Sequence, residues 1–133
     1  EALAIRRALA ARENDNAQRR LDVSFSLMAI GDALAEKGAH RDALAAVHEA
    51  LAIRRALSAA DPGNDGLRCD TAASLTRIAD VLAATGDRAG ALAAYRDGHA
   101  IVQELVARVP GRAEWREDLA AIDACIAELT PAA

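Results

Sequence analysis

Aromatic residues are almost absent from this chain of 133 residues. They make up 2% of the composition and occur once each, as Phe25, Tyr95 and Trp115. A core with so few large rings must be built by close approach of small side chains. Helices rich in alanine, leucine, isoleucine and valine achieve this well, whereas a β-sandwich would need more β-branched and aromatic residues. The composition therefore predicts one all-α domain spanning residues 1–133.

Other scarcities exclude whole classes of function. The net charge is −4, from 16 basic and 20 acidic residues, so the chain has no basic surface for nucleic acid and few rings for base stacking. No apolar run reaches the length of a membrane span. The chain opens in a helical pattern with no signal peptide, and we expect it to be a piece of a longer protein. We therefore expect a cytoplasmic protein that binds neither nucleic acid nor a membrane.

Residues that carry chemistry are also few. Cys69 and Cys125 have no spacing typical of a metal site or a disulfide framework, so we expect two free thiols. The three histidines do not recur at equivalent positions, and the glycines form no phosphate-binding loop. We therefore expect no catalytic residue, no metal and no cofactor, and the chain is not predicted to be an enzyme.

The strongest positive feature is an internal repeat of 48 residues, aligned without gaps. The seven residues from Leu3 to Leu9 recur, unchanged, from Leu51 to Leu57. A weaker third copy begins at Ile101 and continues through Pro110-Gly111, which matches Pro62-Gly63. Apolar residues within each unit follow helical spacing, and breakers separate the helical stretches. We predict helices near 2–13, 17–37, 41–60, 65–85, 89–108 and 113–129.

The repeated positions resemble the tetratricopeptide pattern, in which large and small residues alternate across a helical hairpin. The resemblance rests on two units: Ile30-Gly31, Leu34, Gly38, Ala43, Val47 and Ala50, and then Ile78-Ala79, Leu82, Gly86, Ala91, Tyr95 and Gly98. The usual tryptophan early in the first helix is replaced by Leu27 and Leu75. The common unit has about 34 residues, so the helices here are longer, as in kinesin-light-chain-like repeats, which in bacteria often adjoin signalling or protease-like domains.

The resemblance implies a right-handed α-solenoid of antiparallel helix pairs with about six helices. Residues 1–13 would be the second helix of a truncated repeat. Residues 17–60 and 65–108 would be complete repeats, and 113–129 a C-terminal helix resembling a cap. In this family the first helix of each pair lines the concave face.

One repeated charge pattern is predicted to be structural. Folding each hairpin about its turn places Arg6 or Arg7 opposite Asp22, and Arg54 or Arg55 opposite Asp70. We therefore expect ion pairs between neighbouring helices that set their register. If they are exposed, such pairs contribute at most about 1 kcal/mol to stability.

A second pattern is an acidic ladder of Asp32, Asp80 and Glu128, again 48 residues apart. On the implied fold these carboxylates lie in the concave groove. The other predicted groove residues are Phe25, Met28, Glu36, Thr76 and Arg77. One interpretation is a groove for a basic or mixed peptide, and the other is an ordinary solvated helix surface with local ion pairs. The lysine and asparagine of a peptide-carboxylate clamp are missing from these positions.

The ends of the array offer a different function. A solenoid needs polar caps, but the first predicted helix leaves its outer side bare. We expect Leu3, Ile5 and Leu9 to pack on helix 17–37, and a weak self-association through the N-terminal end. The leading hypothesis is a scaffold that binds a protein or peptide along the concave face. The alternative is an architectural spacer or self-assembling segment of a larger protein, which makes contacts through its open ends.

Overall fold

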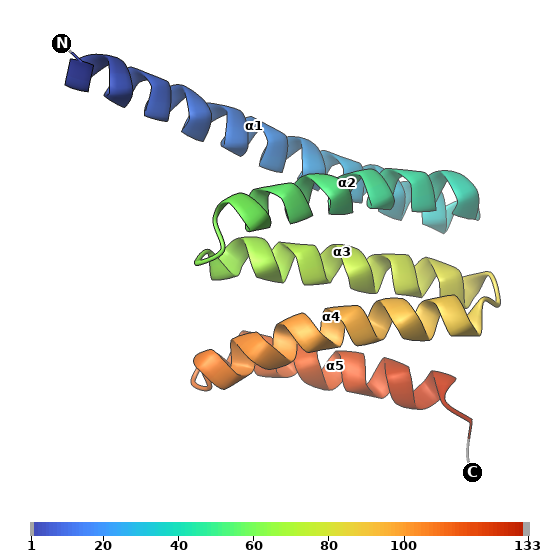
Figure 1. The fold of residues 1–133 in the computed structure, drawn as a ribbon. Coiled ribbons are helices and arrows are strands. Elements are labelled where there is room, and N and C mark those ends of the chain that lie inside the picture. The colour runs from blue at the N-terminus through green and yellow to red at the C-terminus, as the bar shows by residue number, and fades with distance from the viewer. Residues whose placement is uncertain (1, 132–133) are drawn as a thin grey trace.

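The computed structural model describes residues 2–131, apart from the side chains of Leu3 and Ala10. It is all-α and contains five helices: α1 (Ala2–Glu36), α2 (His40–Ala60), α3 (Asp65–Ala84), α4 (Arg88–Arg108) and α5 (Ala113–Leu129). Each helix packs mainly on the next along the chain, and successive helices run in opposite directions (Figure 1). The bounds of α2 to α5 agree with the predicted ranges to within one residue.

The turns confirm the role of the predicted breakers. Gly38 and Gly86 end α1 and α3 with φ angles of 79° and 88°, which glycine adopts without the steric cost of a side chain. Asn64 caps α3, because its side-chain oxygen accepts a hydrogen bond from the backbone N–H of Leu67 at 3.2 Å. Asp87 caps α4 in the same way through Gly90.

Small residues make the helix contacts, as the scarcity of rings predicts. Ala43, Ala50, Ala79 and Ala91 are fully buried in the packed core. Gly31 allows α1 to approach α2 so closely that a Cβ atom there would lie 2.6 Å from a methyl group of Val47. The long side chains of leucine, isoleucine and valine then fill the space around these approaches.

The prediction of six helices is wrong at one place. The expected helices 2–13 and 17–37 form the single helix α1, which has 35 residues. The later turns contain Pro62-Gly63 and Pro110-Gly111, but Asn14-Asp15 stands at the equivalent point of the first unit. Asparagine and aspartate are weak helix formers, whereas proline breaks a helix by removing a donor and clashing with the preceding turn. With no proline, the helix continues.

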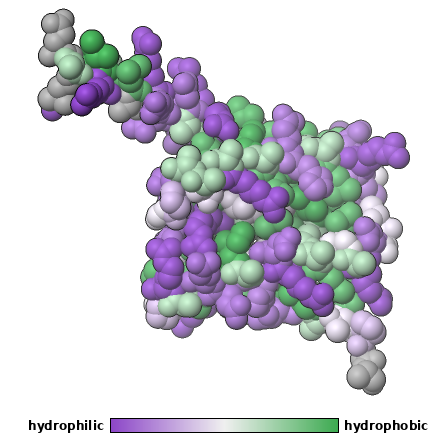
Figure 2. Space-filling view, viewed as in Figure 1, coloured by the Kyte–Doolittle hydropathy of each residue, from purple (hydrophilic) through white to green (hydrophobic). Residues whose placement is uncertain are grey.

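The continuous helix leaves its N-terminal part away from the rest of the protein. The first half of α1 projects beyond the packed helices as an arm (Figures 1 and 2). Ile5 and Leu9 were expected to pack on residues 17–37, but they are 58% and 52% exposed because the arm does not turn back. The side chain of Leu3 lies outside the described residues.

Candidate binding groove

Two adjoining hollows lie on the surface formed by α1, α3 and α5. The first, of about 250 Å³, lies between α3 and α5 over the side chains of Tyr95 and Val102 from α4. The second, of about 290 Å³, lies between α1 and α3, with the first residue of α2 at its edge. Asp80 of α3 lines both hollows, so they adjoin, and we call the surface across α1, α3 and α5 that carries them the groove.

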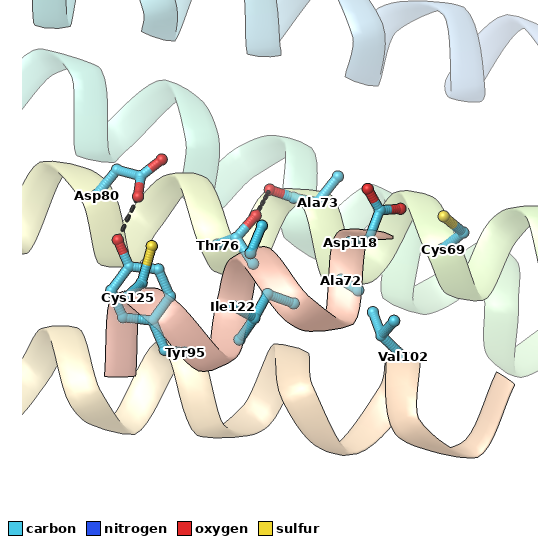
Figure 3. Close-up of a pocket in the computed structure, with 11 residues that line it drawn as sticks. Cys69, Ala72, Ala73, Thr76, Asp80, Tyr95, Val102, Asp118, Ile122 and Cys125 are labelled. Atoms are coloured by element: carbon cyan, nitrogen blue, oxygen red, sulfur yellow. Dashed lines mark hydrogen bonds between the residues drawn. The ribbon is translucent and has the colours of Figure 1, made fainter. Parts of the chain in front are cut away.

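The first hollow has an apolar floor and polar ends (Figure 3). Tyr95, Val102 and Ile122 supply buried apolar surface, and alanines line the α3 and α5 walls. Cys69 and Cys125 lie toward opposite ends of the hollow. Both thiols are free, as the sequence predicts.

A chain of polar contacts crosses the groove at its centre. The hydroxyl of Tyr95 donates a hydrogen bond to the Oδ1 atom of Asp80. The other oxygen of Asp80 lies 3.9 Å from Nη1 of Arg77, and Nε of Arg77 lies 2.8 Å from Oδ1 of Asp32. Burial is the main cause that raises the pKa of Tyr95, and the hydrogen bond from its hydroxyl to Asp80 raises it further. The hydroxyl therefore stays protonated and remains a donor. We call Asp32, Arg77, Asp80 and Tyr95 the groove network.

The groove network alters the predicted acidic ladder. Asp32 and Asp80 do lie in the groove, but they share the positive charge of Arg77 instead of standing as unpaired carboxylates. Glu128 is exposed on α5 and lines neither hollow. Thr76 and Glu36 line the first and second hollow respectively, as expected.

Two of the predicted groove residues belong elsewhere. Met28 is 9% exposed, packs in the core, and its sulfur accepts a hydrogen bond from the hydroxyl of Ser74 at 3.5 Å. The ring of Phe25 lies under the guanidinium of Arg54 from α2, 4.6 Å from its carbon. Met28 therefore packs α1 into the core, Phe25 is 49% exposed beside Arg54, and neither residue lines the two hollows.

The predicted ion pairs between helices are also corrected. Arg6 and Asp22 lie sixteen residues apart on the same helix, a separation of about 24 Å along its axis. Asp22 instead accepts a hydrogen bond from Gln18. Arg54 does reach Asp70, but its Nη1 atom donates to the backbone carbonyl oxygen at 2.9 Å. The prediction placed the two helices in the correct register and chose the wrong acceptor atom.

Asp118 is a groove residue that the sequence analysis did not identify. It lies on α5 at the edge of the first hollow. Its pKa is raised by burial and by the negative charges of Glu114 and Glu117. The recurrence of aspartate at 22, 70 and 118 was visible in the sequence, but that pattern predicted helix pairing and gave no indication of a groove.

The environment of Cys69 leads to a prediction about its reactivity. Burial raises the pKa of the thiol, and the negative charges of Asp118, Asp70 and Glu114 raise it further. Because the thiolate is the reactive form, Cys69 should react slowly with a disulfide reagent near neutral pH. Replacing Asp118 by asparagine removes a negative charge, lowers this pKa and should increase the rate. The rate is measured with an aromatic disulfide in a Cys125→Ser background.

Glu117→Gln is the matched control for this measurement. Glu117 is adjacent to Asp118 and carries the same charge, but it does not contribute to the pKa of Cys69. Its replacement should leave the rate unchanged. Equal rates for the two variants would contradict the predicted influence of Asp118 on the thiol.

In the part of the chain that the structure describes, no three histidine, cysteine, aspartate or glutamate side chains come together in a way that could hold a metal ion. None of the helices between residues 2 and 131 is both long and apolar enough to cross a membrane. Comparison with family models, with curated proteins and with solved structures finds no match to this chain.

Proposed function

We propose that this chain is a tetratricopeptide-type module, a right-handed α-solenoid, that binds a peptide or partner protein in the groove across α1, α3 and α5. The observation that carries the proposal is that two hollows adjoin at Asp80 on the surface of α1, α3 and α5. In the family that the sequence resembles, the first helix of each pair lines the binding face, and α1, α3 and α5 hold those positions in the repeat.

The lining of the groove favours a basic or mixed peptide. Of the described residues that line the two hollows, Arg77 is the one with a permanent positive charge, whereas Asp32, Glu36, Asp80 and Asp118 are acidic. An apolar floor with acidic residues at its ends suits a peptide that alternates apolar and basic side chains. The Nδ1 atom of His40 is buried beside the second hollow without a hydrogen-bond partner.

The test begins with a probe that assumes no natural partner. A random peptide library displayed on phage is selected on the immobilised chain, and an enriched peptide is synthesised with a fluorophore. We expect enrichment of peptides that contain lysine or arginine. Fluorescence anisotropy then measures the affinity for the unaltered chain and for Asp118→Lys, which should bind about tenfold more weakly, or about 1.4 kcal/mol.

Asp97→Lys provides the control for the groove. Asp97 is exposed on α4, lines neither hollow, and its replacement makes the same change of charge. A peptide bound in the groove should tolerate this change. Failure to enrich any peptide, or an equal loss of affinity in the two variants, would contradict the proposed binding site.

The alternative function is that of an architectural spacer or self-assembling segment that makes contacts through the ends of the array. One observation favours it specifically. The arm of α1 carries Ile5 and Leu9 into solvent, four residues apart on one face of the helix, where both are more than half exposed. The two functions use different surfaces and are compatible with each other.

A further inference from the structure

Exposed apolar side chains lie on both halves of α1. Ile5 and Leu9 are on the projecting arm, and Val23 and Ile30, 49% and 50% exposed, are on the half that packs against α2. Their counterparts 48 residues later are mostly covered. Leu57, Thr71 and Ile78 are buried, and Ile53 is half-buried.

The reason for this difference is a missing neighbour. Helix α3 packs between two helices, α2 and α4. In contrast, α1 makes extensive contact with one helix, α2. In the repeat, α2 stands to α1 as α4 stands to α3. The neighbour that α1 lacks is therefore the counterpart of α2, and residues 2–13 match residues 50–61, which cover the C-terminal half of α2, in the repeat.

The first unit also contains the polar residues that α1 would use to contact such a neighbour. In the contact of α2 with α3, Nη1 of Arg54 donates to the carbonyl of Asp70 and, at 3.0 Å, to the hydroxyl of Ser74. One repeat earlier the same three residue types occur as Arg6, Asp22 and Ser26. Arg6 and Ser26 are both exposed, and they lie on one straight helix where they cannot meet.

The arm cannot cover its own helix while α1 is continuous. The segment that would form the turn contains Asn14-Asp15 in place of the proline and glycine that break the chain between α2 and α3. The arm thus matches a site on its own chain but is held away from that site by a straightened hinge. This arrangement favours exchange of the arm between two copies.

We propose that two copies of this chain form a dimer by exchanging residues 2–13. Each arm packs on residues 17–28 of the partner's α1, and Arg6 donates hydrogen bonds to the carbonyl of Asp22 and to Ser26 of the other copy. Arg54 lies opposite Asp70 and Ser74 in the contact of α2 with α3. The equivalent pairing one repeat earlier, of Arg6 with Asp22 and Ser26, places the two α1 helices antiparallel with the twofold axis near Asp15. This inference does not depend on the proposed groove function.

Sedimentation velocity of the full chain at several concentrations gives the first test. We expect a species of twice the chain mass of 13.9 kDa that dissociates on dilution. Arg6→Glu places a carboxylate against the carbonyl of Asp22 and should weaken the dimer at least about tenfold. Arg7→Glu makes the same change of charge at a position whose counterpart, Arg55, is exposed, and it should leave the dimer intact.

A hinge variant separates the exchanged dimer from other modes of association. Asn14→Pro combined with Asp15→Gly introduces the breaker found at Pro62-Gly63 and lets the arm fold back on its own helix. We expect this variant to be a monomer with helical content similar to that of the unaltered chain. A monomeric unaltered chain, equal effects of Arg6→Glu and Arg7→Glu, or a hinge variant that remains dimeric would each overturn the proposal.

Discussion

Replacing Arg54 by alanine should lower the free energy of unfolding by about 2–4 kcal/mol. The side chain is 2% exposed and connects three helices. Its Nε atom donates to Ser24 of α1 at 3.0 Å, and its Nη1 atom donates to Asp70 and Ser74 of α3. Alanine would remove these bonds and leave a cavity in which surrounding groups must rearrange. Urea unfolding followed by far-ultraviolet circular dichroism measures the change.

Two further variants identify the cause of the stability loss expected for Arg54→Ala. Arg55→Ala changes the adjacent exposed arginine and should cost less than about 0.5 kcal/mol. Arg54→Met keeps most of the volume without the charge, whose burial is already costly enough to lower the pKa of the guanidinium. Since apolar replacements of buried charges can be nearly neutral, we expect Arg54→Met to be more stable than Arg54→Ala. Equal stability of Arg54→Ala and Arg55→Ala would contradict a structural role for this arginine.

Replacing Trp115 by alanine should cost about 3–5 kcal/mol, which is the range for removing a large buried ring. Trp115 is 2% exposed at the start of α5 and, with Ile122, is one of the two buried residues of that helix. The guanidinium of Arg112 also stacks on its ring at 4.3 Å. Because α5 forms one wall of the first hollow, the loss should loosen the groove as well as the fold.

The same urea measurement serves for Trp115, together with the reactivity of Cys69. Burial raises the pKa of the Cys69 thiol, and Asp118 and Glu114 of α5 raise it further, so loosening α5 should expose the thiol, relieve their effect and speed its modification in the Cys125→Ser background. Trp115→Phe retains a ring and should lose less than half as much stability. Glu117→Ala, on the exposed side of α5, should change neither quantity. An unaltered unfolding curve for Trp115→Ala would refute its role in anchoring α5.

Much of the fold could be predicted from the sequence because its determinants are local. Apolar spacing locates the helices, and glycines at 38 and 86 locate two turns through their positive φ angles. Pro62-Gly63 and Pro110-Gly111 locate the other two turns. These signals act within a few residues, so the bounds of α2 to α5 were predicted closely.

The turn predicted near residue 14 is absent because the first unit lacks the proline and glycine of the later units. The identical residues from Leu3 to Leu9 and from Leu51 to Leu57 suggested identical roles. The substitution of Asn14-Asp15 for proline and glycine is a small change in sequence. It nevertheless decides whether the chain turns or continues as a helix.

The sequence by itself determined that this protein is helical and built from a 48-residue unit, because periodicity and breakers act locally. It also determined which residues of successive units are equivalent, including Arg54 opposite Asp70. Only the tertiary structure decided that Arg54 is buried and bonded to a carbonyl, and that Asp32 and Asp80 share Arg77. Those outcomes depend on side-chain directions and on which neighbour is present, and both are set by packing between residues distant in the chain.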